Sequence, residues 1–162
     1  MPYSIVEQLN NDFDVLLFDG HKLIHIATAG SILPAKLGQT QVNFDEQIRK
    51  VYRYRRVFEV IVNSDLIRNN FTDQKSYFES FTYMAKRGFY SYDKVDIDNI
   101  ENQNYQLVAR PTYNRKIELT NPEQEIYPEV RSRYSLKSNI IFIETSKEFP
   151  DTFNEFNITD FL

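Results

Sequence analysis

The sequence predicts an α+β fold, with an antiparallel sheet and one main amphipathic helix plus shorter helices packed on one face. Three observations predict this class. Two apolar segments meet at an Asp-Gly dipeptide, which is typical of a β-hairpin. Apolar side chains at helical spacing occupy residues 73–87. Segments rich in β-branched and aromatic residues follow this helix, as expected for further strands of one sheet.

The size and composition of the chain indicate one folded domain over residues 1–162. Hydrophobic residues make up 41% of the sequence and aromatic residues 15%, with 13 Phe and 11 Tyr. This apolar content is enough for a substantial core. Charged residues make up 26%, close to the ~25% of average globular proteins, so global disorder is not expected.

The same composition excludes several classes of protein. The chain has no cysteine, which excludes disulfides, thiolate zinc sites and cysteine nucleophiles. A net charge of −4 argues against non-specific binding to DNA. The N-terminal residues do not resemble a signal peptide, and no apolar run approaches the ~20 residues of a transmembrane helix. We therefore expect a cytoplasmic protein that does not enter a membrane.

The hairpin comprises residues 13–18 and 21–28. Asp19 and Gly20 between them suit a type I′ turn, which needs a positive φ angle at both positions.

Short helices are expected on either side of this hairpin. Ile5, Val6 and Leu9 have the spacing of a short N-terminal helix. After the hairpin, Ser31 is a suitable N-cap for a turn of helix through Leu37.

The main helix is predicted from about Asp73 to Arg87. Thr72 is a suitable N-cap, and Gly88 can take the left-handed conformation that ends many helices. Its apolar face would consist of Tyr77, Phe78, Phe81, Met84 and Ala85.

The segment 43–62 combines two patterns. Its first half has a helical stripe that begins at Phe44, and its second half is rich in β-branched residues. We predict a short helix that changes to a strand near Lys50. On such a strand Arg53 and Arg55 would point to one side and Tyr52 to the other.

Four later strands are predicted, over residues 89–95, 105–110, 134–136 and 140–144. The connection from Pro111 to Pro128 contains three prolines, which argues against regular structure there. The C-terminal phenylalanines indicate that the tail packs on the domain; they are Phe149, Phe153, Phe156 and Phe161.

Two Arg-x-Arg pairs form the candidate binding site. Guanidinium groups suit phosphate and carboxylate, and a neighbouring tyrosine can stack on a base. The residues predicted to form this site are Tyr52, Arg53, Arg55, Arg131 and Arg133. The alternative is that these arginines lie in solvent or pair with acids of the same chain, such as Glu59 or Glu129.

No catalytic, metal or cofactor site is predicted. His21 and His25 lie ~13 Å apart on a strand, too far for one metal ion. His25 suits a general base beside a carboxylate such as Asp14, or else a packed core residue. Residues 96–101 are acidic but lack the turn glycine of a calcium loop. With four glycines in the chain, neither nucleotide-binding glycine loop is present.

Three functions follow from these patterns. The first is a cytoplasmic binding protein without catalysis, which recognises a protein partner or a second copy of itself through Tyr and Arg side chains. The second is a nucleotide- or RNA-binding domain that uses the arginine pairs. The third is a metal-independent hydrolase or transferase that uses His25.

Overall fold

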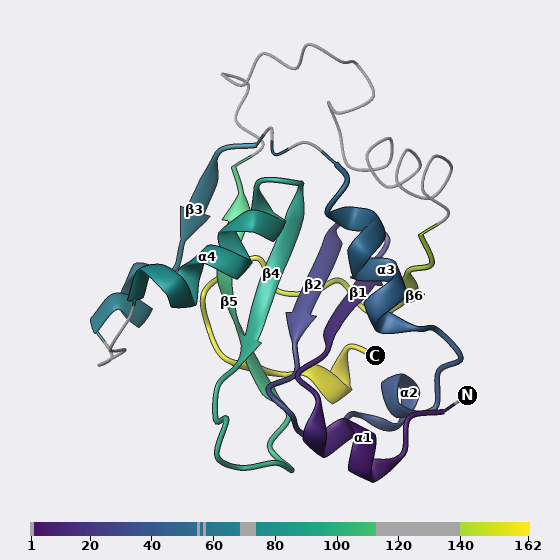
Figure 1. The fold of residues 1–162 in the computed structure, drawn as a ribbon. Helices are drawn as coiled ribbons and strands as arrows, with labels where there is room; N and C mark the ends of the chain where they lie inside the picture. The colour runs from purple at the N-terminus through teal and green to yellow at the C-terminus, as the bar shows by residue number, and fades with distance from the viewer. Residues whose placement is uncertain (1, 55, 57, 69–73, 113–139) are drawn as a thin grey trace.

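The computed structural model describes residues 2–54, 56, 58–68, 74–112 and 140–162, and it confirms the α+β class (Figure 1). The elements follow in this order: α1 (Ile5–Asn10), β1 (Asp14–Phe18), β2 (Leu23–Ala27), α2 (Ala35–Gly38), α3 (Phe44–Val51), β3 (Val60–Val62), the 3₁₀ helix η1 (Ser64–Arg68), α4 (Gln74–Ala85), β4 (Phe89–Lys94), β5 (Asn104–Pro111), β6 (Ile143–Glu144), β7 (Phe156–Asn157) and the 3₁₀ helix η3 (Ile158–Asp160).

The sheet is mixed, which corrects the antiparallel prediction. Its strand order is β3-β5-β4-β2-β1-β6, and β7 pairs with β5. The β1–β2, β4–β5, β3–β5 and β5–β7 pairs are antiparallel, whereas β2–β4 and β1–β6 are parallel. The reason is the long connection between β2 and β4, which contains α2, α3, β3 and α4. A connection of this length returns the chain to its starting end and permits parallel pairing.

Both faces of the sheet are covered, so the prediction that all helices lie on one face is wrong. Helix α3 packs on β1 and α4 packs on β4 and β5, with β2 between them (Figure 1). The opposite face packs against α2, through Leu37, and against the C-terminal segment. Strands β2 and β4 are buried along their whole length. A strand whose side chains are buried on both faces requires packed elements on both sides of the sheet.

The hairpin is confirmed, but its turn differs from the predicted one. Phe18 pairs with Leu23, so the connection has four residues. Gly20 has a φ of 92°, whereas Asp19 does not have the positive φ that a type I′ turn requires. Instead the Asp19 carboxylate accepts hydrogen bonds from the backbone N–H groups of His21 and Lys22. An aspartate side chain that binds the backbone two residues later replaces a backbone turn.

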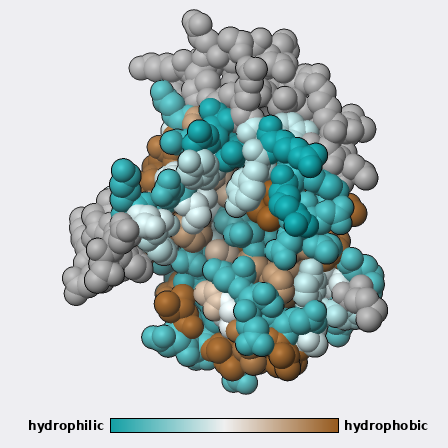
Figure 2. All heavy atoms as spheres, viewed as in Figure 1, coloured by the Kyte–Doolittle hydropathy of each residue, from teal (hydrophilic) through white to brown (hydrophobic). Residues whose placement is uncertain are grey.

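The main helix and its end are confirmed within the described residues. Helix α4 ends at Ala85, and Gly88 has a φ of 103°. Thr72 and Asp73, predicted at its start, lie outside the described residues. Helix α1 is also confirmed, with a capping box between Ser4 and Glu7. Its apolar residues are exposed, and Figure 2 shows hydrophobic atoms gathered at this end of the molecule.

The segment after α3 is a turn, which corrects the predicted strand near Lys50. Helix α3 continues to Val51, and among the described residues the next strand is β3, which begins at Val60. The cause is Arg87, whose guanidinium donates hydrogen bonds to the backbone carbonyls of Tyr52 and Tyr54 at 3.4 and 3.1 Å. These carbonyls are therefore held by a side chain two residues beyond the end of α4 instead of by a strand partner.

The later strands are confirmed where they are described. Strands β4 and β5 match the predictions closely, β6 is shorter than predicted, and residues 134–136 lie outside the described residues. Ser31, predicted as a helix N-cap, precedes α2 by four residues and is buried beside Lys94. The C-terminal phenylalanines pack on the sheet as predicted, with Phe149 among the core residues.

Candidate functional site

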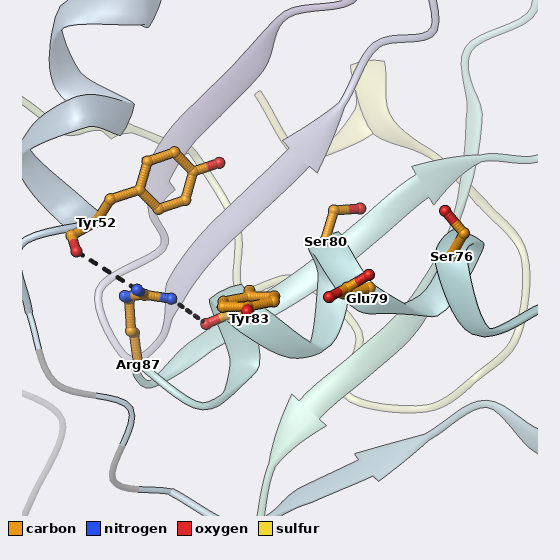
Figure 3. A pocket seen from close by; sticks show the side chains of 6 residues that line it. All are labelled: Tyr52, Ser76, Glu79, Ser80, Tyr83 and Arg87. Atoms are coloured by element: carbon orange, nitrogen blue, oxygen red, sulfur yellow. Dashed lines mark hydrogen bonds between the residues drawn. The ribbon is translucent and has the colours of Figure 1, made fainter.

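The candidate site is a pair of adjoining cavities along α4, which we call the α4 cleft. The larger cavity has a volume of about 850 Å³ and lies between α4 and the sheet. The smaller, of about 480 Å³, lies between α4 and the end of α3 (Figure 3). Ser76 and Ser80, one helical turn apart on α4, line both cavities. These volumes are in the range of small-molecule sites.

A chain of hydrogen bonds forms one wall of the larger cavity. His25 Nε2 lies 2.6 Å from Asp14 Oδ1, and His25 Nδ1 lies 2.5 Å from Ser91 Oγ. A carboxylate only accepts hydrogen bonds, so the N–H group at Nε2 donates the hydrogen bond to Asp14. His25 is 1% exposed and Ser91 is fully buried, so the Asp14 carboxylate is the member of the chain that meets the cavity.

The strand register explains this arrangement. Asp14 pairs with Ala27 across the hairpin, and His25 pairs with Ser91 on β4. Residues two apart on a strand share a face, so His25 and Ala27 point the same way as Asp14 and Ser91. The three polar side chains therefore meet diagonally across three neighbouring strands.

The environment of Asp14 favours its ionised form. Burial raises the pKa of this carboxyl group, but the hydrogen bond and the charge of His25 outweigh burial, and the pKa is lowered below its usual value. Asp14 is therefore a fixed negative charge at neutral pH.

Two further aspartates line the same cavity, and their pKa values are shifted in the opposite direction. Burial raises the pKa of Asp93 to about 6, although Tyr77 and the Lys94 N–H donate hydrogen bonds to it. Burial also raises the pKa of Asp12, and the nearby charge of Asp14 adds to this effect. Three carboxyl groups thus share one cavity and repel one another when all are ionised.

The ammonium group of Lys94 does not form an ion pair with any of these three carboxylates. Lys94 Nζ donates hydrogen bonds to Ser31 Oγ and to the Asn99 carbonyl, both at 2.6 Å. Within the ranges that the structure describes, no Lys or Arg forms an ion pair with Asp12, Asp14 or Asp93. The larger cavity is therefore the acidic end of the cleft.

The smaller cavity is the aromatic end. The Arg87 guanidinium lies over the rings of Tyr52 and Tyr83, 5.5 and 5.6 Å from their centroids. Arg87 also donates to the Tyr83 carbonyl at 2.9 Å. In Figure 3 the Tyr52 side chain faces α4 across the cavity. Two aromatic rings are thus held in place around one buried cation.

Of the predicted arginine–tyrosine site, the structure describes only Tyr52 and Arg53. Both are exposed in the turn after α3, and Tyr52 reaches the cleft. Arg55, Arg131 and Arg133 lie outside the described residues, so their convergence stays a prediction.

Sequence reasoning recognised His25 with Asp14 but missed the rest of the site. The core position of His25 does not suit a group that exchanges protons directly with a substrate. Ser91 and Asp93 were missed, because no local pattern shows that β4 pairs with β2, and Tyr77 was predicted only as part of the apolar face of the main helix. One weak signal in the sequence could have indicated them: Ser91 and Asp93 alternate with aromatic residues on a predicted strand, so they share one of its faces.

No known protein family matches this sequence, and neither curated proteins nor solved structures show a significant similarity to it. Among the described residues, no group of three or more His, Asp or Glu side chains is arranged to hold a metal ion. None of the described helices has the length and apolar content needed to cross a bilayer.

Proposed function

We propose that this protein binds a small molecule in the α4 cleft. The observation that carries the proposal is the chain from Ser91 through His25 to Asp14 at the wall of a cavity of about 850 Å³. Burying such polar groups costs free energy unless every partner is provided. Here the buried members hold one carboxylate in a fixed position on a cavity of ligand size, as in a preorganised binding site.

The proposal is for binding without catalysis. Of the hydrogen-bond chain, only Asp14 lines the cavity, since His25 and Ser91 are covered. The function as a nucleotide- or RNA-binding domain depends on arginines outside the described residues, and it stays a prediction. The cytoplasmic location is likewise a proposal, supported by the absence of cysteine from the chain.

A variant that fills the cleft tests this function. We expect Ser80→Trp to abolish the binding of fragments that shift the amide NMR signals of Ser76 and Asp14 in the unmodified protein. The indole ring would occupy the wall that both cavities share. The measurement is a fragment screen by amide chemical-shift mapping on the full chain.

Lys75→Trp is the matched control, because Lys75 is an exposed α4 residue outside both cavities. It should leave fragment binding unchanged. Fragments that bind Ser80→Trp as well as the unmodified protein would argue against the cleft as the ligand site.

A protein partner is a second candidate, and Tyr52 favours it. This side chain is 49% exposed, yet Arg87 holds its ring and its carbonyl. A rigid, exposed tyrosine loses little conformational entropy when a partner covers it, and tyrosine is common at the centres of protein interfaces.

Selection of displayed peptides against the full chain tests this second candidate. Peptides that recognise this surface should lose at least tenfold in affinity with Tyr52→Ala, in line with the ~2 kcal/mol typical of a central interface residue. Ile141→Ala, which removes another exposed apolar side chain, is the control. Equal affinities for the two variants would leave Tyr52 without a role in recognition.

A further inference from the structure

We infer that the ligand of the α4 cleft is an organic cation with a flat apolar body, such as an amine joined to an aromatic ring. This inference rests on the proposed function and adds the chemical class of the ligand. It depends on the different character of the two ends of the cleft and on the wall of α4 that they share.

The acidic end determines the charge of the ligand. Asp12, Asp14 and Asp93 line one cavity; Asp14 pairs with His25, and no Lys or Arg of the described residues pairs with any of the three. An ammonium or amidinium group there would form charge-assisted hydrogen bonds and relieve the repulsion between the carboxylates. A bare metal ion fits less well, since the described acids are not arranged around a common point.

The aromatic end determines the body of the ligand. Tyr52 presents a ring surface beside Arg87, whereas the Tyr83 ring is also covered by the Arg56 guanidinium, 4.5 Å from its centroid. Glu79 also lines this end, but the guanidinium groups of Arg87 and Arg56 repel a cationic head, so the head is directed to the acidic end and the apolar body to Tyr52. Flat rings bind well to such surfaces by stacking.

The shared wall guides the choice of a probe. Ser76 and Ser80 line both cavities and are four residues apart on α4, which corresponds to a rise of about 6 Å. We choose a probe with a flexible spacer of about this length between its ring and its nitrogen, so that it can follow this wall. Four methylene groups provide it, and 4-phenylbutylamine is a simple probe of this kind.

The experiment compares 4-phenylbutylamine with 4-phenylbutan-1-ol, which has the same ring and spacer but no charge. Binding to the full chain is followed by amide NMR shifts at Ser76 and Ser80. We expect the amine to bind at least tenfold more tightly than the alcohol. Asp14→Asn should remove most of this difference and leave the affinity for the alcohol unchanged, whereas Tyr52→Leu should weaken both compounds.

Asp12→Asn gives a second reading if Asp14→Asn does not fold, because Asp12 is not a member of the buried hydrogen-bond chain. It should also reduce the preference for the amine. Equal affinities for amine and alcohol would overturn the inference and leave the cleft as a binding site. Shifts of neither compound at the cleft, up to their solubility limits, would overturn both the inference and the proposed function.

Discussion

Phe149→Ala is expected to lower the free energy of unfolding by about 3–5 kcal/mol. Phe149 is 2% exposed and lies among the rings of Tyr92, Phe156 and Phe161, whose centroids are 5.5, 5.5 and 5.6 Å away. Removal of the ring leaves a cavity that these neighbours cannot fill without moving. The backbone N–H of Phe149 also donates to Asp19, which holds the tail to the hairpin turn. Urea unfolding followed by circular dichroism measures the change.

Phe153→Ala is the control for this prediction. Phe153 belongs to the same C-terminal segment but is only partly buried at the edge of the core. The same truncation there should cost less than half as much. If the two variants were equally stable, the Phe149 ring would not stabilise the fold more than the partly buried Phe153 ring does.

The aromatic packing behind this prediction could be anticipated from the sequence, because it depends on residue type and local spacing. The hairpin, the main helix and the docking of the C-terminal phenylalanines were predicted for this reason. In each case apolar periodicity or a turn residue specifies the local structure. Gly88, for example, ends α4 with the positive φ expected for a helix C-terminus.

The site itself could be anticipated only in part, because it forms across strands that are distant in sequence. Asp14 and His25 belong to one hairpin, and their proximity follows from the strand alternation. Ser91 and Asp93 join them through the parallel pairing of β2 with β4, which depends on the long connection between these strands. No local pattern encodes that choice of partner.

The predicted strand around Tyr52 failed for a similar reason. The alternation of Tyr and Arg is compatible with a strand, but Arg87, more than thirty residues later, binds the backbone carbonyls of this segment. A tertiary interaction thus overrode a weak local preference, as is common for β propensity.

The buried carboxyl of Asp93 gives the second large effect, which depends on pH. Asp93 is 8% exposed, and burial raises its pKa to about 6, against ~3.9 in an unfolded chain. Between these values the folded protein binds more protons than the unfolded chain, so this group lowers stability as pH rises from about 4 to 6. The asparagine in Asp93→Asn cannot ionise, so the variant does not undergo this loss of stability. We therefore expect the variant to gain stability over the unmodified protein, from near zero at pH 4 to about 3 kcal/mol at pH 7.5.

Unfolding in urea at a series of pH values measures this difference, and other titrating groups largely cancel because both proteins contain them. Tyr77→Phe provides the opposing control. The Tyr77 hydroxyl donates to Asp93 at 2.7 Å and lowers its pKa, so its removal should move the Asp93 titration, followed by carboxyl ¹³C NMR, to higher pH. A constant stability difference between Asp93→Asn and the unmodified protein across this range would mean that Asp93 ionises as easily in the fold as in water. The cleft would then not impose on this carboxyl the low-dielectric environment that its burial implies.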